Sequence, residues 1–523
     1  MTKKLILIST LLLSPLFGES KSLNENDKTS ISLSLNSLIK EVLIRNGDAI
    51  KEQLQVSISA NQVEYEEGIY DPLFTTNFLR QSTNVPNSVE NELVRYQETY
   101  QDRVDFFDAG VSGLLPSGAK WSFLYSNNKK NSSLIEQNKD YDTEYDTTFK
   151  LELEQPLLKN AGIEITEAKI ALSKFENKVK ENGYKQKLME LQGLTIQVYW
   201  RLYGAQKIYK SWDNSIALAK KSLKDLELRA KSGKIAQTEV LEAKSALNIR
   251  MSEYENAKNR FNEAQNQVLT LLNLPFNQNN NFVFEISDSP ISDIKQLLNS
   301  KEYIELALEK WPEYQNAKQN VKKEQLQTKY SQNQTLPQLN IVGSLERTSL
   351  ENNRSDSYDN SIDPEFSSWT MGVKLSMPIL NQQANTSLEI SKIKLQQAKI
   401  ELATLENNLI NSIMTKIDNV NSSIKQYSLY KEGLDYKKYL LEIENNKLLL
   451  GKANARELFE KEEDYMNYQR KFLSSIINWK TSEALLEIST GNLLKKHNIK
   501  IENLAQTSRT KSKKISDIFG ENK

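Results

Sequence analysis

The side chains that most often carry catalysis are scarce in this chain of 523 residues. It has no cysteine, and its one histidine, His497, lies in a weakly structured segment near the C-terminus. A lone histidine there is more often a surface residue than a base or a metal ligand. The sequence also shows no glycine-rich phosphate loop, nucleophile elbow or histidine-containing metal motif. We therefore expect no enzymatic activity, no cofactor and no metal site.

Pairs of glutamates are the charged residues whose spacing stands out. Two glutamates follow a glycine by six and by nine residues, and the pattern occurs twice, as Gly233, Glu239, Glu242 and as Gly451, Glu457, Glu460. Their effect would be electrostatic, and it depends on the elements that position them.

A longer internal repeat surrounds these glutamates. Three segments recur in the same order: Tyr70–Pro72 as Thr335–Pro337, Glu154–Leu158 as Ser376–Leu380, and Arg229–Lys234 as Lys447–Lys452. The distance from the proline of the second segment to the tip glycine is 77 residues in the first copy and 73 in the second. The matches predict two copies of one unit, repeat 1 over 35–277 and repeat 2 over 301–494.

Long amphipathic helices are expected after the second segment of each repeat. From Phe175 to Leu226 most apolar residues are three or four positions apart, which is typical of a helix with coiled-coil character. The predicted helices cover about 162–232, 234–272, 384–450 and 452–488. The first would be roughly 105 Å long. Such long apolar stripes cannot be buried within one chain, which favours several chains packed around an axis.

Alternating segments precede each long helix and predict strands. Trp369, Met371, Val373, Leu375 and Met377 share one phase, and polar or small residues occupy the other. An apolar face opposed by a charged face is typical of a barrel strand between lipid and water. A half-buried sheet of a soluble protein is the alternative.

The β region of the first repeat is larger than that of the second. Its extra residues, 83–145, contain two predicted strands, Val104–Leu114 and Ala119–Ser126. Either the first repeat contributes four strands and the second two, or the extra pair forms a hairpin outside a sheet of four strands per chain.

The two ends of the chain and its middle are predicted to lie outside the repeats. Residues 1–20 have the charged start and apolar stretch of a secretory signal peptide, and that stretch is too short to span a bilayer. Residues 21–34 and 278–300 are predicted linkers, and 495–523 a disordered tail.

The overall charge excludes one large class of partner. Lys plus Arg and Asp plus Glu both total 68. A balanced charge lacks the basic footprint of nucleic-acid-binding proteins, so we expect no nucleic acid.

The order, spacing and duplication of these features resemble the TolC-like outer-membrane efflux protein family over roughly residues 35–494. The resemblance implies a mainly α fold with a β-barrel: a homotrimer whose 12-stranded, possibly 18-stranded, barrel lies in outer-membrane lipid. The barrel continues into a long α-helical barrel through the periplasm of a bacterium. It also implies a passive exit duct of a tripartite efflux or type I secretion system. Its partners would be a periplasmic adaptor protein and an inner-membrane RND, ABC or MFS pump.

The resemblance also assigns roles to particular residues. Pro156 and Pro378 would be the strand-to-helix junctions. Adaptor docking would occur at two periplasmic tips, whose residues are Gly233, Arg229 and Lys234 in repeat 1 and Gly451, Lys447 and Lys452 in repeat 2. Glycine suits a tip because it reverses the chain without a Cβ penalty.

An acidic ring at the tunnel entrance is the other implied site. The resemblance assigns Glu457 and Glu460 to it, with Glu239 and Glu242 as their repeat equivalents. A ring of carboxylates favours cations. The alternative is a solvated glutamate-rich helix face, because Glu462 and Glu463 lie nearby. Ala453 and Leu448 stand where better-known members have an Arg and a Tyr that close the entrance, so those gate bonds are not expected here.

A second function remains open from sequence alone. A periplasmic coiled-coil scaffold or adaptor would also have long helical hairpins. The amphipathic strands before each long helix and the duplication argue against it.

Overall fold

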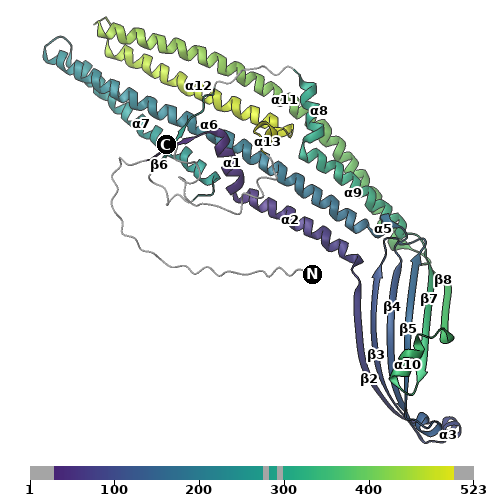
Figure 1. The fold of residues 1–523 in the computed structure, drawn as a ribbon. Coiled ribbons are helices and arrows are strands. Elements are labelled where there is room, and N and C mark those ends of the chain that lie inside the picture. Colours follow the sequence, from purple (N-terminus) through teal and green to yellow (C-terminus); the bar gives the residue numbers. More distant parts are fainter. Residues whose placement is uncertain (1–28, 275–281, 291–298, 451, 500–523) are drawn as a thin grey trace, which may run out of the picture.

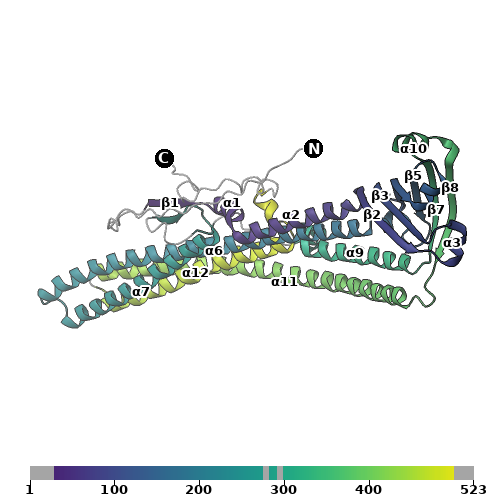
Figure 2. The ribbon, with the colours of Figure 1, turned by 90° about the horizontal axis from the view of Figure 1, so that it is seen from below.

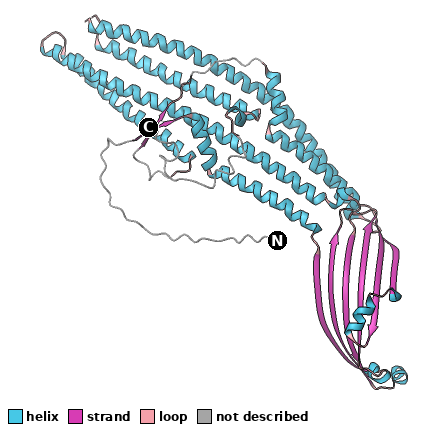
Figure 3. Ribbon diagram, viewed as in Figure 1, coloured by secondary structure: helices cyan, strands magenta, loops and turns pink. Residues whose placement is uncertain are grey.

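The chain folds into an elongated molecule with long helices at one end and a single large sheet at the other (Figures 1 and 3). The computed structural model describes residues 29–274, 282–290, 299–450 and 452–499. The predicted signal peptide, Gly451 and most of the predicted tail lie outside these residues. None of the helices in the described ranges combines the length and the hydropathy needed to cross a membrane.

Two helices run through most of the helical part and set its length. They are α6 (Ala168–Lys231) and α11 (Gln382–Leu449), with 64 and 68 residues. At 1.5 Å per residue both are close to 100 Å long. The helices α2 (Gly47–Glu67) and α9 (Pro312–Gln334) lie beside them near the sheet, and α7 (Gln237–Leu271) and α12 (Ala455–Ser489) lie beside them at the far end (Figures 1 and 2).

The neighbours of each helix define a curved layer with two edges. Towards the sheet the order is α2, α6, α9, α11, and towards the tips it is α7, α6, α12, α11. One edge of the layer is therefore α11, and the other is formed by α2 and α7. The shorter helices are α1 (Leu35–Arg45), α3 (Val89–Arg95), α4 (Ser133–Asn138), α5 (Ile163–Thr166), α8 (Ser300–Lys310), α10 (Arg354–Ser361) and α13 (Leu493–Lys496).

The large sheet has six antiparallel strands in the order β2-β3-β4-β5-β7-β8. Their bounds are β2 Leu73–Pro86, β3 Thr99–Leu114, β4 Lys120–Ser132, β5 Thr143–Pro156, β7 Gln338–Glu351 and β8 Ser367–Ser376. The two strands expected in the insertion, β3 and β4, pair inside the sheet and do not form a separate hairpin. The first half of the chain thus supplies four strands and the second half two.

The two faces of this sheet differ in chemistry. One row of paired residues across all six strands is entirely apolar: Phe74, Val111, Phe123, Leu151, Leu345 and Trp369. The next row, on the opposite face, contains Lys150 beside Glu346, and Lys150 also forms an ion pair of 3.4 Å with Glu152. The alternation expected from the sequence therefore extends across the whole sheet.

A short parallel sheet joins two segments that we predicted to be linkers. β1 (Thr29–Leu33) pairs with β6 (Phe282–Ile286). The buried Tyr199 of α6 fixes the pair, because its hydroxyl donates to the carboxylate of Asp288 at 2.8 Å and lies 3.1 Å from the carbonyl oxygen of Leu33. The linker prediction was incomplete here, since five-residue strands give little alternation and their pairing partners lie far apart in sequence.

The chain leaves the sheet for a helix at two places, near Pro156 and near Pro378. Pro156 is the last residue of β5, and Pro378 follows the end of β8 by two residues. Asn160 and Asn381, which follow them, have positive φ angles of 63° and 43°. Asparagine tolerates this left-handed conformation, which turns the chain from the sheet into the helices.

Candidate functional site

The first helical tip is closed by a glycine in the left-handed conformation. Gly233 has a φ of 70°, and the amide of Lys234 donates to the carbonyl of Arg229 at 2.9 Å. This bond satisfies one of the free carbonyls at the end of α6, as in many helix termini that end in glycine. A Cβ at Gly233 would meet no described atom within 4 Å, so the surface there is open to a partner.

The second tip is closed by an equivalent hydrogen bond, although its glycine, Gly451, lies outside the described residues. The amide of Lys452 donates to the carbonyl of Lys447 at 2.8 Å, which is the counterpart of the bond between Lys234 and Arg229. The two matching segments found in the sequence therefore have the same hydrogen bond.

The glutamate six residues after each glycine has a structural explanation. Glu239 and Glu457 are both the third residue of a returning helix, after Ala236 and Asn454 at the N-cap. Asn454 accepts a hydrogen bond from the amide of Glu457 at 2.9 Å and donates one to its carboxylate at 3.0 Å. Carboxylates are favoured in a first helical turn, so helix initiation alone can account for this spacing.

The charged side chains at the tips form short-range pairs and do not gather in one cluster. Arg229 pairs with Asp225 at 2.9 Å, Lys447 with Glu444 at 3.1 Å and Glu460 with Arg456 at 3.2 Å. The pairs formed by Arg229 and by Glu460 are largely exposed and contribute little to stability, whereas Glu444 is buried. The exposed members of these pairs remain accessible to a partner.

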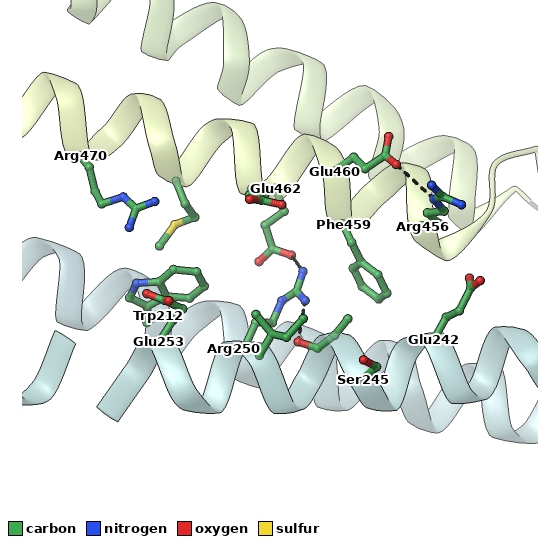
Figure 4. Close-up of a pocket in the computed structure, with 14 residues that line it drawn as sticks. Trp212, Glu242, Ser245, Arg250, Glu253, Arg456, Phe459, Glu460, Glu462 and Arg470 are labelled. Carbon is green, nitrogen blue, oxygen red and sulfur yellow. Dashed lines mark hydrogen bonds and ion pairs between the residues drawn. The ribbon is translucent and has the colours of Figure 1, made fainter. Parts of the chain in front are cut away.

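A groove between α7 and α12 is lined by one glutamate from each of the two pairs (Figure 4). It has a volume of about 460 Å³ and includes Glu242 of the first pair and Glu460 of the second. Trp212, Phe459 and Met466 supply apolar lining. The groove therefore joins the two hairpins near their tips.

A buried ion pair lies against this groove and links three helices. Glu462 of α12 pairs with Arg250 of α7 and accepts a hydrogen bond from Ser215 of α6. The guanidinium of Arg250 also donates to the carbonyl of Ala246 at 2.9 Å and lies 4.5 Å from the ring centre of Phe459. Its Nε finds no hydrogen-bond partner among the described residues.

This ion pair corrects one interpretation of the sequence. Glu462 was grouped with solvated glutamates, but it is buried and holds the hairpins together. Leu458 and Met466, four positions away on either side, are buried on the same face of α12. A glutamate in phase with an apolar stripe was the signal that could have revealed its role.

A second anchor fixes α12 near its C-terminal end. The ammonium of Lys496 pairs with Glu483 at 2.9 Å and with Glu487 at 3.2 Å, and that of Lys480 lies 4.0 Å from the ring centre of Trp479. Burial alone would raise the pKa of Glu483, but Lys496 and Lys480 lower it below its usual value. Burial lowers the pKa of Lys480. The two anchors therefore fix the segment from Glu462 to Lys496 at both of its ends.

The described residues contain no group of three or more histidine, aspartate or glutamate side chains placed to hold a metal ion.

Comparison with known proteins identifies the fold. Residues 303–492 match the outer membrane efflux protein family. The CmeC outer membrane channel of Campylobacter jejuni is 14% identical, with 95% of this chain and 99% of that chain covered and a TM-score of 0.61. The Neisseria gonorrhoeae MtrE outer membrane channel is 13% identical, with 91% and 97% covered and a TM-score of 0.58.

A third structure agrees with these two. CusC, whose structures concern transmembrane channel formation, is 12% identical, with 87% of this chain and 92% of that chain covered and a TM-score of 0.60. No curated protein matches the chain. The resemblance drawn from the sequence is confirmed, and the chain has the fold of these channels along almost its whole length.

Proposed function

We propose that this chain is the outer-membrane exit duct of an export system, a passive conduit with no catalytic role. The observation that carries the proposal is the continuity of a two-faced sheet with helices close to 100 Å long. The sheet is tall and apolar enough on one face for a bilayer, and the helices are long enough to extend far into the periplasm.

The register of the sheet supports closure into a barrel. Following the pairing from Leu73 across the six strands leads to Thr370, six residues before β8 ends at Ser376. Six residues over six strands is a shift of one residue per strand. This shift corresponds to a strand tilt of about 36°, the value of closed barrels in which the shear number equals the number of strands. β2 and β8 are the two edges and run antiparallel, so β8 of one copy can pair with β2 of the next.

Three copies would give an 18-stranded barrel and a ring of twelve helices. The edges of the helical layer carry exposed apolar side chains that such a ring would cover. They are Ile393, Ile400, Leu429 and Tyr439 on α11, and Leu54, Ile58, Leu241 and Ile249 on α2 and α7. Because the two edges differ, the α11 edge of one copy would contact the α2 and α7 edge of the next copy.

The tips would receive a periplasmic adaptor protein coupled to an inner-membrane pump. Gly233 and the exposed charges beside it offer an open surface for this contact. RND, ABC and MFS pumps all remain compatible with the structure, as do efflux and type I secretion. Glu460 lines the groove between α7 and α12 near the same end, and by our proposal Glu457 and Glu460 would ring the entrance.

Conductance of the purified protein in a planar lipid bilayer tests the duct and the ring together. We expect small cation-preferring currents, and we expect Glu457→Ala with Glu460→Ala to weaken that preference. The matched control is Glu239→Ala with Glu242→Ala in the first repeat. An unchanged preference in the first variant would remove the acidic ring, and no conductance from any variant would overturn the duct.

Fractionation separates the duct from a periplasmic scaffold. A barrel stays with the outer membrane after washing with carbonate, whereas a coiled-coil scaffold is released. Recovery in the soluble periplasmic fraction would contradict our proposal.

A further inference from the structure

Two exposed apolar patches lie in the connections between strands of the sheet, one on α3 between β2 and β3 and one after α10 between β7 and β8. The first is on α3, where Val89, Leu93 and Val94 are 72–75% exposed. The second follows α10, where Ile362 and Phe366 are 52% and 58% exposed. Leaving apolar side chains of this size in water is unfavourable compared with burying them.

The first patch belongs to a well-defined element. Ser88 caps α3 by accepting a hydrogen bond from the amide of Asn91 at 3.3 Å. Arg95 donates to the side chain of Asn87 at 3.1 Å and lies 4.6 Å from the ring centre of Tyr100. These contacts fix α3 while its apolar side chains point away from the rest of the chain.

The second patch is fixed in a similar way. Arg347 of β7 donates to the carbonyl of Ile362 at 2.9 Å, and Asp363 accepts from the amide of Glu365 at 3.1 Å. Ser357 of α10 donates to Thr147 at 2.7 Å, which holds the preceding helix on the sheet. Both patches are therefore presented by ordered backbone.

Lipid is a poor occupant for the first patch. A charged row lies between α3 and the apolar rows of the sheet, and in it Arg80 pairs with Asp105 at 2.5 Å beside Lys129. The hydrocarbon of a bilayer would end before this row, so α3 would lie beyond it.

The strand register brings the two patches together between copies. This step rests on the barrel proposed above. With Ser376 of one copy beside Leu73 of the next, Ser367 lies beside Ser82. Residues 362–366 directly precede Ser367 and include the short 3-10 helix Pro364–Phe366, so they lie close to residues 83–87, which lead into α3.

We infer that the apolar face of α3 packs against Ile362 and Phe366 of the neighbouring copy, forming a clasp between subunits at the outer rim of the barrel. The occupant of each patch is a second copy of this chain. The contact continues the strand pairing of β8 with β2 and buries side chains that no described part of the same chain covers.

Disulfide cross-linking tests the clasp, and the chain suits it because it has no native cysteine. Val89→Cys, Leu93→Cys and Val94→Cys are each combined with Phe366→Cys and oxidised in isolated outer membranes. We expect at least one pair to convert most of the monomer into covalent dimers and trimers on a denaturing gel. Each single-cysteine variant should stay monomeric.

A reference pair separates failure of the clasp from failure of the barrel. Thr75→Cys with Lys374→Cys lies within the proposed pairing of β2 with β8, in the same register. Cross-linking of the reference pair without any rim pair would overturn the clasp and leave the duct intact. If neither the reference pair nor any rim pair cross-links, the assembly proposed above is wrong.

Discussion

The two helical hairpins have the same backbone plan but different side-chain contacts. Residues of α11 and α12 near the tip lie 218 positions after their counterparts in α6 and α7, the offset between the two tip glycines. By this offset Ser215 and Arg250 correspond to Gly433 and Tyr468. In the first hairpin these positions hold Glu462 of the other hairpin, whereas in the second the glycine leaves room for the tyrosine ring.

This difference shows how side-chain contacts join two similar hairpins to each other. Each hairpin could have packed only within itself, as Gly433 and Tyr468 do. The buried ion pair instead joins the hairpins to each other, close to the end where an entrance would lie. A buried pair adds little net stability but penalises separation, because opening it would leave a charge unpaired in a low-dielectric site.

Breaking that joint should have the largest effect. Glu462→Leu leaves Arg250 buried without its partner, so we expect local stability to fall by about 3–5 kcal/mol. Amide hydrogen exchange in α7 and α12 around the groove measures this as faster opening. Arg250→Met combined with Glu462→Leu should restore most of the protection.

The repeat provides a matched control for this experiment. Lys244 occupies the position equivalent to Glu462 and forms an exposed ion pair with Glu227 at 3.2 Å. Lys244→Ala should cost less than about 1 kcal/mol. Equal effects at the two positions would contradict the distinction between the hairpins.

A smaller effect is expected from filling the space under Tyr468. A Cβ at Gly433 would lie 2.7 Å from the ring of Tyr468, so Gly433→Ala should destabilise the second hairpin by about 1–3 kcal/mol. Gly183→Ala in α6 is the control, because its Cβ would meet no described atom within 4 Å. That change should stabilise the helix by about 0.5–1 kcal/mol. Thermal unfolding in detergent compares the two, and shifts of the same sign would refute the packing argument.

The helix caps give the smallest contrast. Asn454→Ala should cost about 1 kcal/mol at the start of α12, and Ala236→Asn should stabilise the start of α7 by a similar amount. Hydrogen exchange of the first-turn amides reports both changes. If Asn454→Ala leaves that turn of α12 unaffected, the cap does not explain the glutamate spacing.

The helices, strands and tips could be predicted because their signals are local and repeated. Apolar spacing defined α6 and α11 almost to their ends. Alternation defined the strands that lead to each strand-to-helix junction. β1 and β6 could not be predicted, because their hydrogen bonds join segments some 250 residues apart. Local periodicity carries no information about such pairing.

The candidate site was predicted less completely than the fold. The spacing of Glu457 and Glu239 suggested an electrostatic role, but the same spacing is what a helix start selects. Glu462 was grouped with exposed acids because one sequence does not show which face of a coiled coil meets another helix. The joint between the hairpins depends on three helices, so the sequence could indicate that Glu462 lies on the apolar face of α12 but not which residues it contacts.

Because α6 and α11 are long continuous helices, a small rotation at one end of either helix displaces its other end by a large distance. Their sheet ends are fixed by the turns at Asn160 and Asn381, and their far ends carry the tips. For a rigid rod close to 100 Å long, a tilt of about 3° at the sheet end displaces the other end by roughly 5 Å. A change in angle too small to disturb the strands would therefore move a tip by more than the diameter of a water molecule.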